Sequence, residues 1–339
     1  MIKKINPLQI GVDLGTANTI IVNHERVLLN EPSIIAIDKR SSSIVAVGRK
    51  ALDMHEKTHY NLKTIKPLKD GVIADYSAAE KMLREFVSIS GNNKYSLGAK
   101  KFLICIPYYT TEVEKRAVRD SAQAAGASEV FMIHEPIAAG IGAGVDIFEP
   151  KGHMLVDIGG GTIEVAVLSL SSVVCNQSLR IGGNTFDKDI VDHVRRNYNL
   201  MISEKTAERT KLALGAAIYD LEDAPPPMQV VGRDLASGLP RSIVLTHSDI
   251  FLMMDKTISQ IEEGVLKTLE KCPPELSGDI YSNGIMLTGG GAFIRGLAKR
   301  LSLKTRLPVK LVQNPLLSVM QGITKCLNNF DSFQHVFIS

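Results

Sequence analysis

The chain has 339 residues and a formal net charge of +3, from 39 basic and 36 acidic residues. This length suggests about two domains, and a hydrophobic content of 45% is sufficient for complete cores. The nearly balanced charge gives no electrostatic reason to expect nucleic acid as the main partner. A chain without tryptophan and with 5% aromatic residues is also a poor platform for base stacking.

The four cysteines are widely separated and form no C-x-x-C motif, which indicates reduced thiols rather than a disulfide framework. The opening residues, M-I-K-K-I-N-P-L-Q-I, are too few and too polar for a signal peptide, and no apolar run is long enough to span a bilayer. We therefore expect a cytoplasmic protein, for which attachment to a membrane surface stays open.

The first predicted element is a strand–turn–strand unit at residues 10–22, with the sequence I-G-V-D-L-G-T-A-N-T-I-I-V. Its turn at Gly15 exposes backbone N–H groups that can cradle phosphate oxygens, because no Cβ blocks the approach. Asp13 is placed to hold a hydrated Mg²⁺ ion. A single motif of this kind is a weak indication, since Asp-x-Gly is common in ordinary hairpins.

Strands and helices then alternate, which is typical of the α/β class. A β-rich segment with strands near 33–37 and 44–47 precedes a capping box at Ser77 and Glu80, which opens a helix. Glycines at 140, 142 and 144 indicate close helix packing. The other elements of the first half are strands at 101–107 and 129–135, a helix from the Thr111–Glu114 capping box to about 125, and a helix from Pro136.

Glu135 ends a predicted strand and precedes Pro136, so its side chain should project at the floor of a cleft. A carboxylate there could orient or deprotonate a water molecule that attacks a γ-phosphate. It could equally be an acidic residue that complements the dipole at a helix N-terminus. The residues alone favour neither interpretation.

A second copy of the first unit, L-V-D-I-G-G-G-T-I-E-V-A-V, lies at residues 155–167. Asp157 and Gly159 repeat Asp13 and Gly15 in the same strand–turn–strand context. Two such copies indicate a duplicated core whose two turns would face each other and clamp a polyphosphate. Thr162, at the end of the second turn, could fix the attacking water through its hydroxyl group, or could simply favour a strand.

A third glycine turn, T-G-G-G-A at Thr288–Ala292, follows a predicted strand at 284–287 and opens a predicted helix at 293–301. A helix N-terminus suits a phosphate or a ribose edge, and consecutive glycines let a flat base approach the backbone. A plain turn would need at most one glycine. The other elements are strands at 153–159, 162–170 and 173–180, helices at 185–197, 203–215, 248–271 and 316–327, and a break at 224–227.

Two further patterns have ordinary explanations. Glu208 and Lys211 share one helix face and could reach a nucleoside, but a solvated ion pair is favoured without more context. The stretch from His55 to His59 matches H-E-x-x-H, the zinc-protease helix. It is short and polar and lies in the small β-rich segment without an obvious third ligand, so a zinc site is disfavoured.

We therefore expect an α/β fold of two duplicated core lobes around a nucleotide cleft. The first lobe covers 1–148 and carries a small β-rich insert at about 31–76. The second covers 149–339 and carries a mainly helical insert at about 183–246. The helix at about 316–327 should pack back on the first lobe.

Assembled, these residues resemble the actin-fold ATPases, and specifically the MreB family of bacterial actins. The likeness covers nearly the whole chain, so it predicts the actin-like fold with two core lobes and two smaller subdomains. The phrases that carry it are Asp13–Thr19, Leu29–Ser33, Lys66–Asp75, Glu135–Gly144, Val156–Thr162, Gly232–Leu235, Cys272–Leu276 and Leu287–Ala292.

The resemblance implies slow hydrolysis of ATP to ADP and phosphate, coupled to polymerisation and dependent on Mg²⁺, with GTP open as an alternative nucleotide. Glu135 and Thr162 would be catalytic and would position the hydrolytic water, while Asp13 and Asp157 would hold the metal through water. The nucleotide would contact Gly15, Thr16, Ala17, Asn18, Gly159, Gly160, Gly161, Thr162, Glu208, Arg209, Thr210, Lys211, Gly289, Gly290, Gly291 and Ala292.

Two positions depart from the family pattern. Ile163 stands where a second threonine is common, and Asn184 stands where Gly-Gly-Asp is usual. The first departure could slow hydrolysis, and the second puts one polar contact near the helical insert in doubt.

The resemblance also implies filaments at the inner face of the cell membrane that organise cell-wall synthesis and cell shape. The expected partners are other copies of the chain, the membrane surface, and cell-wall synthesis and membrane scaffold proteins, with no nucleic acid. Tyr95 and Leu97 lie among lysines in the loop 92–101 and are candidates for membrane contact, although an ordinary solvated loop fits equally. The alternative function is a metabolite kinase or a chaperone-type ATPase on the same fold.

Overall fold

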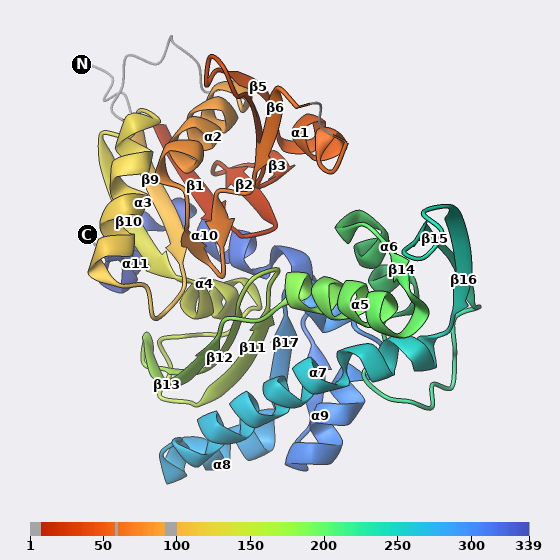
Figure 1. Ribbon diagram of the computed structural model, residues 1–339. Helices are drawn as coiled ribbons and strands as arrows, with labels where there is room; N and C mark the ends of the chain where they lie inside the picture. Colours follow the sequence, from red (N-terminus) through yellow and green to blue (C-terminus); the bar gives the residue numbers. More distant parts are fainter. Residues whose placement is uncertain (1–7, 58–59, 92–99, 339) are drawn as a thin grey trace. The chain divides into compact units, whose positions relative to one another are not determined.

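The computed structural model describes residues 8–57, 60–91 and 100–338 (Figure 1). The chain divides into two compact units. Unit 1 comprises Met1–Lys151, Leu168–Val174 and Leu316–Ser339, and unit 2 comprises Gly152–Val167 and Cys175–Pro315. The expectation that Tyr95 and Leu97 touch a membrane concerns residues outside the described part of the chain.

The core of unit 1 is a five-stranded sheet in the order β10-β9-β1-β2-β3. β1 pairs antiparallel with β2 and parallel with β9, which in turn pairs parallel with β10. The strands are β1 (Leu8–Leu14), β2 (Asn18–Val22), β3 (Val27–Pro32), β9 (Lys100–Ile106) and β10 (Glu129–His134).

The second five-stranded sheet has the equivalent order, β13-β12-β11-β17-β18. β11 pairs parallel with β17, and β17 pairs parallel with β18, as β1, β9 and β10 do in the first sheet. The duplication predicted from two short motifs is thus present in the strand order of both sheets. The strands are β11 (His153–Ile158), β12 (Ile163–Ser169), β13 (Ser172–Leu179), β17 (Ile285–Thr288) and β18 (Val309–Leu311).

Helices cover the first sheet and bury its apolar side chains. The capping box of Thr111 and Glu114 is present at the start of α3, as predicted. α2 differs from the prediction, because Asp75 rather than Ser77 caps it by accepting a hydrogen bond from the N–H of Ala78. The helices are α2 (Tyr76–Ile89), α3 (Glu112–Ala124), α4 (Glu135–Gly142), α10 (Ser318–Asn328) and α11 (Phe330–Phe333).

α4 and α10 pack closely against each other, with a glycine of each helix at the contact (Figure 1). A methyl group at Gly142 would overlap the carbonyl oxygen of Ser318, and one at Gly322 would overlap the carbonyl oxygen of Ala138. The glycine-rich sequence of α4 therefore serves close helix packing, as expected for Gly142.

A smaller sheet in the order β5-β4-β6 and a hairpin of β7 and β8 follow β3. α1 ends at Met54, so the described part of the H-E-x-x-H stretch, residues 55–57, is not helical. The ring Nδ1 of His55 lies 2.8 Å from the hydroxyl of Thr64, and the described residues contain no cluster of three or more His, Cys, Asp or Glu side chains that could hold a metal ion. The elements are β4 (Ile35–Asp38), β5 (Ile44–Val47), α1 (Gly48–Met54), β6 (Leu62–Ile65), β7 (Leu68–Lys69) and β8 (Val72–Ile73).

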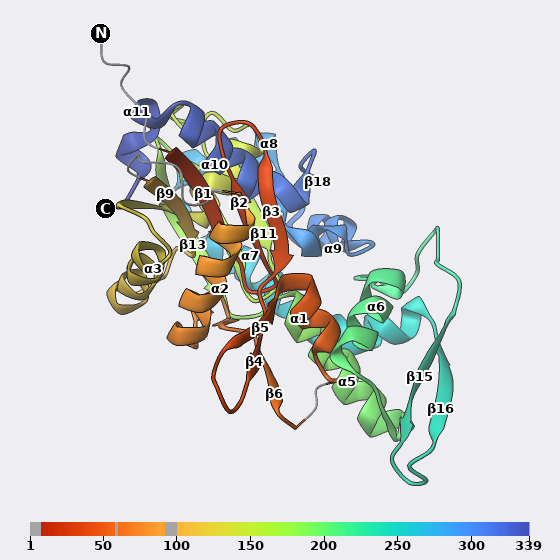
Figure 2. The same cartoon turned by 90° about the horizontal axis from the view of Figure 1, so that it is seen from above.

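Unit 2 adds a smaller subdomain that combines helix and sheet. Figure 2 shows the hairpin of β15 and β16 beside α6, a β-sheet that the expectation of a mainly helical insert omitted. The sheet order is β14-β15-β16. Outside its five-stranded sheet, unit 2 contains α5 (Gly183–Tyr198), β14 (Leu200–Met201), α6 (Glu204–Leu214), β15 (Met228–Asp234), β16 (Pro240–Leu245), α7 (His247–Glu270), α8 (Pro274–Asn283) and α9 (Leu297–Thr305).

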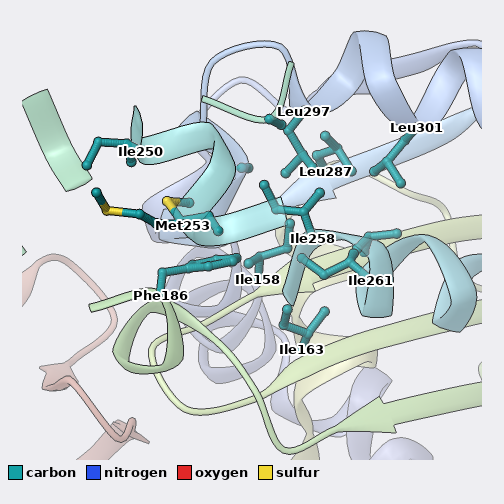
Figure 3. Close-up of a cluster of buried hydrophobic side chains, with 14 of the residues drawn as sticks. Ile158, Ile163, Phe186, Ile250, Met253, Ile258, Ile261, Leu287, Leu297 and Leu301 are labelled. Carbon is teal, nitrogen blue, oxygen red and sulfur yellow. The ribbon is translucent and has the colours of Figure 1, made fainter. Parts of the chain in front are cut away.

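The core of unit 2 joins the sheet to α5, α7 and α9. Phe186 of α5 lies among Ile158, Ile163 and Ile258, and all four side chains are at most 1% exposed (Figure 3). Burial of these large side chains stabilises the fold by about 1.5–3 kcal/mol each. The core therefore fixes the ends of β11 and β12, between which the second glycine turn lies.

Among the described residues, no helix is both long enough and apolar enough to cross a membrane.

The α4–α10 contact generates the first prediction. Gly142→Ala should destabilise the protein by about 1–3 kcal/mol, because the new methyl group meets a backbone oxygen that cannot rotate away. Gly278→Ala is the matched control, since nothing lies within 4 Å of its added methyl group and alanine favours the helix α8. Thermal melts of both variants give the comparison, and equal melting temperatures would contradict the packing argument.

Candidate functional site

The first glycine turn connects β1 to β2 in unit 1. A Cβ at Gly15 would lie 2.6 Å from the carbonyl oxygen of Asn18, so only glycine allows so tight a turn. Ala17 and Asn18 are exposed at the tip, and Asp13 is partly buried at the end of β1. The turn thus presents backbone groups to a ligand without a side chain in the way.

The hydroxyl of Thr16 is oriented by the β7–β8 hairpin. It accepts a hydrogen bond of 2.9 Å from the N–H of Gly71, so its own proton is left to donate to a ligand oxygen. Ser33 supports the turn from below, because its hydroxyl donates to the carbonyl of Gly15 at 2.6 Å. These contacts hold the turn in one conformation before any ligand arrives.

The second glycine turn, between β11 and β12, has the same local geometry. The N–H of Gly159 donates to the carbonyl of Thr162 at 2.9 Å, and a Cβ at Gly159 would lie 3.1 Å from that oxygen. In the first turn, a Cβ at Gly15 would likewise meet the carbonyl oxygen of the residue three positions further on, Asn18. The repeat therefore includes the crowding at the first residue of each turn.

The N-terminus of α5 lies directly against the second turn. The N–H groups of Gly183 and Asn184 donate to the carbonyls of Gly159 and Gly160, at 3.0 and 2.8 Å. A Cβ at Gly182 would also approach those carbonyls too closely. Since a helix N-terminus carries partial positive charge, α5 raises the affinity of the turn for anions. The side chain of Asn184 is exposed, so it is not needed for this contact.

The third glycine turn packs on the end of β11. A Cβ at Gly291 would overlap the side chain of Ile158, and one at Gly289, whose φ is +79°, would overlap the Asp157 carboxylate. These two glycines are therefore required by the packing of the chain itself, and close approach of a base is not needed to explain them. The contact places Gly289–Ala292 beside Asp157 and the second turn.

The helix predicted at 293–301 is displaced. Gly290–Phe293 forms a short 3₁₀ helix, and the α-helix α9 begins only at Leu297. The hydroxyl of Thr288 and the N–H of Gly289 both donate to the carbonyl of Pro315, which tightens the chain before a regular helix can start. The N–H groups at the third turn are consequently those of a 3₁₀ turn.

Burial raises the pKa of Asp157 from its ordinary value of 3.8 to about 6. Ionisation of this carboxyl group therefore costs more free energy in the ligand-free protein than it does in water. A divalent cation beside the carboxylate would remove that penalty, because it stabilises the charged form. The donor set and the raised pKa of Asp157 thus fit a hydrated Mg²⁺ ion.

Lys211 pairs with a carboxylate other than Glu208, which the sequence had favoured as its partner. Its ammonium group lies 2.9 Å from the Asp187 carboxylate and donates to the carbonyl of Gly183, whereas Glu208 is exposed. Burial raises the pKa of Asp187 to about 6, and the Lys211 ammonium opposes this rise. The ion pair fixes α6 against the N-terminus of α5, which places one positive charge near the second turn.

Sequence reasoning missed Asp187, although a carboxylate on the buried face of an amphipathic helix could have signalled it. The residues around Lys211 on α6 also differ from the expectation that all of them contact the nucleotide. Thr210 is fully buried and its hydroxyl donates to the carbonyl of Thr206, so its side chain does not contact a ligand. Glu208 and Arg209 are exposed and are the only members of this group, apart from Lys211, that could reach one.

Glu135 is the first residue of α4 and follows His134, the last residue of β10. Burial, together with the nearby Lys115 ammonium, lowers the pKa of His134 to about 4, so the imidazole is neutral at physiological pH. Its Nδ1 atom is buried without a hydrogen-bond partner. The ring beside Glu135 therefore adds no positive charge of its own, and the sequence pattern did not single out His134.

Ile163 belongs to the core of unit 2 and is fully buried beside Phe186 (Figure 3). Its side chain points away from the face of β12 that carries Thr162, because neighbouring residues alternate along a strand. The isoleucine therefore contributes to core packing, and its effect on hydrolysis stays a prediction.

Each unit thus assembles its own set of candidate ligands. Unit 1 brings together Asp13, residues 15–18 and the N–H of Gly71 around one glycine turn. Unit 2 brings together Asp157, the second and third glycine turns, the N-terminus of α5 and Lys211.

The chain matches the model of the MreB/Mbl protein family over residues 7–335. It is 45% identical to the cell shape-determining protein MreB of Escherichia coli (strain K12), over 98% of this chain and 97% of that protein. It is 40% identical to the cell shape-determining protein Mbl of Bacillus subtilis (strain 168), over 95% of this chain and 96% of that protein.

Solved structures show the same similarity. MreB5 of Spiroplasma citri bound to ADP matches with a TM-score of 0.91 and 36% identity, over 97% of this chain and 99% of that chain. The same protein bound to AMPPNP matches with a TM-score of 0.90 and 35% identity. The actin-like fold expected from the sequence is therefore confirmed, and the chain belongs to the MreB/Mbl family.

Proposed function

We propose that this chain is an ATP- and Mg²⁺-dependent cytoskeletal protein that polymerises into filaments and helps to determine cell shape. The observation that supports this most directly is the repeated glycine turn. The Cβ positions of Gly15 and Gly159 are both crowded by the carbonyl oxygen three residues further on, and each turn follows a strand that carries an aspartate. A duplicated phosphate cradle of this kind suits a nucleoside triphosphate held from two sides.

The phosphate groups would be held mainly by uncharged donors. Backbone N–H groups of both turns and the hydroxyl proton of Thr16 supply hydrogen bonds, and α5 adds its positive end. The third turn and Lys211 would lie beside the nucleoside. The related MreB5 has been solved with ADP and with AMPPNP, which supports an adenine nucleotide as the ligand.

Asp13 and Asp157 would hold Mg²⁺ through water molecules. The metal, when bound, neutralises charge on the phosphate oxygens. Glu135 and the hydroxyl of Thr162 would orient the attacking water, whose oxygen forms the new bond to the γ-phosphorus while the bond to the β-phosphate oxygen breaks. The products are ADP, phosphate and a proton.

Nucleotide held by both units would favour one arrangement of those units over others, as in hinge-type switches. Contacts between unlike surfaces of successive copies do not close into a ring, so they propagate a filament. Loss of the γ-phosphate would weaken this arrangement and the filament. Relatives named for determining cell shape support the role in cell shape. The filaments would act at the inner membrane surface, together with cell-wall synthesis and scaffold proteins, as the resemblance in sequence implies.

Asp157→Asn should abolish Mg²⁺-dependent nucleotide binding, which titration calorimetry measures. It should also raise the melting temperature of the nucleotide-free protein by a few degrees at pH 7.5, because an ionised buried carboxylate destabilises the fold. The gain should shrink as the pH falls from 6 towards 4, where the wild-type carboxyl is increasingly protonated. The exposed Asp220→Asn is the control, and wild-type affinity in Asp157→Asn would refute the assignment.

Glu135→Ala should retain nucleotide binding but lose phosphate release by a factor of about 10²–10⁴, the range of a positioned acid–base group. Binding of AMPPNP and release of phosphate are measured on the same preparation. Glu25→Ala, an exposed residue of unit 1, serves as the control. Unchanged turnover in Glu135→Ala would exclude Glu135 from this role.

Polymerisation separates the proposed function from a metabolite kinase. ATP with Mg²⁺ should raise light scattering of the purified chain and yield a sedimentable polymer, whereas ATP with a chelator should not. A kinase on the same fold would remain in the supernatant. Absence of polymer with any nucleotide, at concentrations where nucleotide is bound, would contradict the filament proposal.

A further inference from the structure

β12 presents two different faces. Ile163, Val165 and Val167 point into the core of unit 2. Because side chains alternate along a strand, Thr162 and Glu164 lie on the opposite face, about 7 Å apart along the chain. Glu164 is only 2% exposed, so a buried carboxylate lies on the same face as the threonine that ends the second glycine turn.

Two polar side chains of β13 hold this carboxylate. The amide nitrogen of Asn176 donates to one carboxylate oxygen at 2.9 Å, and the hydroxyl of Ser178 donates to the other at 2.5 Å. Both oxygens are therefore fixed in direction. Such precise orientation is typical of a group that acts on a neighbour rather than one that only fills space.

One hydrogen-bond acceptor in this network has no partner. The amide oxygen of Asn176 is buried without a hydrogen-bond partner, and the residue is 5% exposed. An unsatisfied buried acceptor costs about 1–3 kcal/mol. Buried polar atoms of this kind usually bind an ordered water molecule that makes two to four hydrogen bonds.

A buried carboxylate is also an expensive way to fill this position. Well-packed apolar residues of similar volume are often as stable as, or more stable than, buried charged groups. The position two residues beyond Thr162 gives the charge a use that core packing does not.

We propose that Glu164 is a positioning residue for ATP hydrolysis. With Asn176 and Ser178 it holds an ordered water molecule next to Thr162, and this water orients the one that attacks the γ-phosphate. The inference rests on the proposed ATPase function and adds a residue that the sequence patterns did not indicate. No atom of the network is consumed, and the bonds made and broken remain those of hydrolysis.

Glu164→Gln tests the proposal, because it preserves the volume and removes the charge. The expected result is a fall in kcat for phosphate release of tenfold or more, with KM and the affinity for AMPPNP within twofold of wild type. Sedimentation with AMPPNP should be unchanged, and the melting temperature should not fall, because a buried charge is removed without loss of volume. A residue that only stabilised the fold would lower the melting temperature when replaced, without this separation of kcat from KM.

Two further variants keep the test decisive. Ser178→Ala removes one hydrogen bond and keeps the charge, so kcat should fall about threefold to tenfold, and this variant decides the matter if Glu164→Gln does not fold. Ser169→Ala, a buried serine at the far end of β12, is the matched control and should behave as wild type.

The inference and the proposed function fail in different ways. Wild-type turnover in Glu164→Gln, measured while Glu135→Ala is inactive, would overturn the role of Glu164 and leave the ATPase intact. A wild-type chain that neither binds nor hydrolyses ATP would overturn the function itself.

Discussion

The structure depends on two short turns that each begin with glycine. A Cβ at Gly15 would overlap the carbonyl oxygen of Asn18 at 2.6 Å, and one at Gly159 would be crowded by the carbonyl oxygen of Thr162 at 3.1 Å. This steric constraint directs the backbone N–H groups at the tip outward. The surrounding sheets have equivalent strand orders because each sheet carries one such turn at the same place.

In unit 2, the second glycine turn also determines how α5 and the third glycine turn pack. The carbonyls of the second turn accept hydrogen bonds from the first N–H groups of α5, and the third turn packs on the preceding strand end. The raised pKa of Asp157 and the Asp187–Lys211 ion pair follow from this crowding, because carboxylates are enclosed where little water can reach them. The raised pKa values of these two carboxyl groups are therefore a result of close packing around them.

Sequence patterns predicted what is periodic or repeated: the strand–turn–strand unit at each of the two turns, the capping box at Thr111 and the close helix packing at Gly142. They did not predict side-chain pairings across elements. Lys211 pairs with Asp187, which is 24 residues earlier and on another helix, and Glu164 is held from a different strand. Such pairings depend on the direction in which each buried side chain points, and a linear pattern does not contain that information.

The contact between α4 and α10 also has a consequence for biosynthesis. Residues that meet at Gly142 and Gly322 lie at distant points of the chain, with all of the second sheet encoded between them. A ribosome must therefore release almost the entire polypeptide before the first unit can acquire α10. During translation, the surface of α4 that this helix later covers stays without its partner, so the packing of the first unit is completed only after the second sheet has been synthesised.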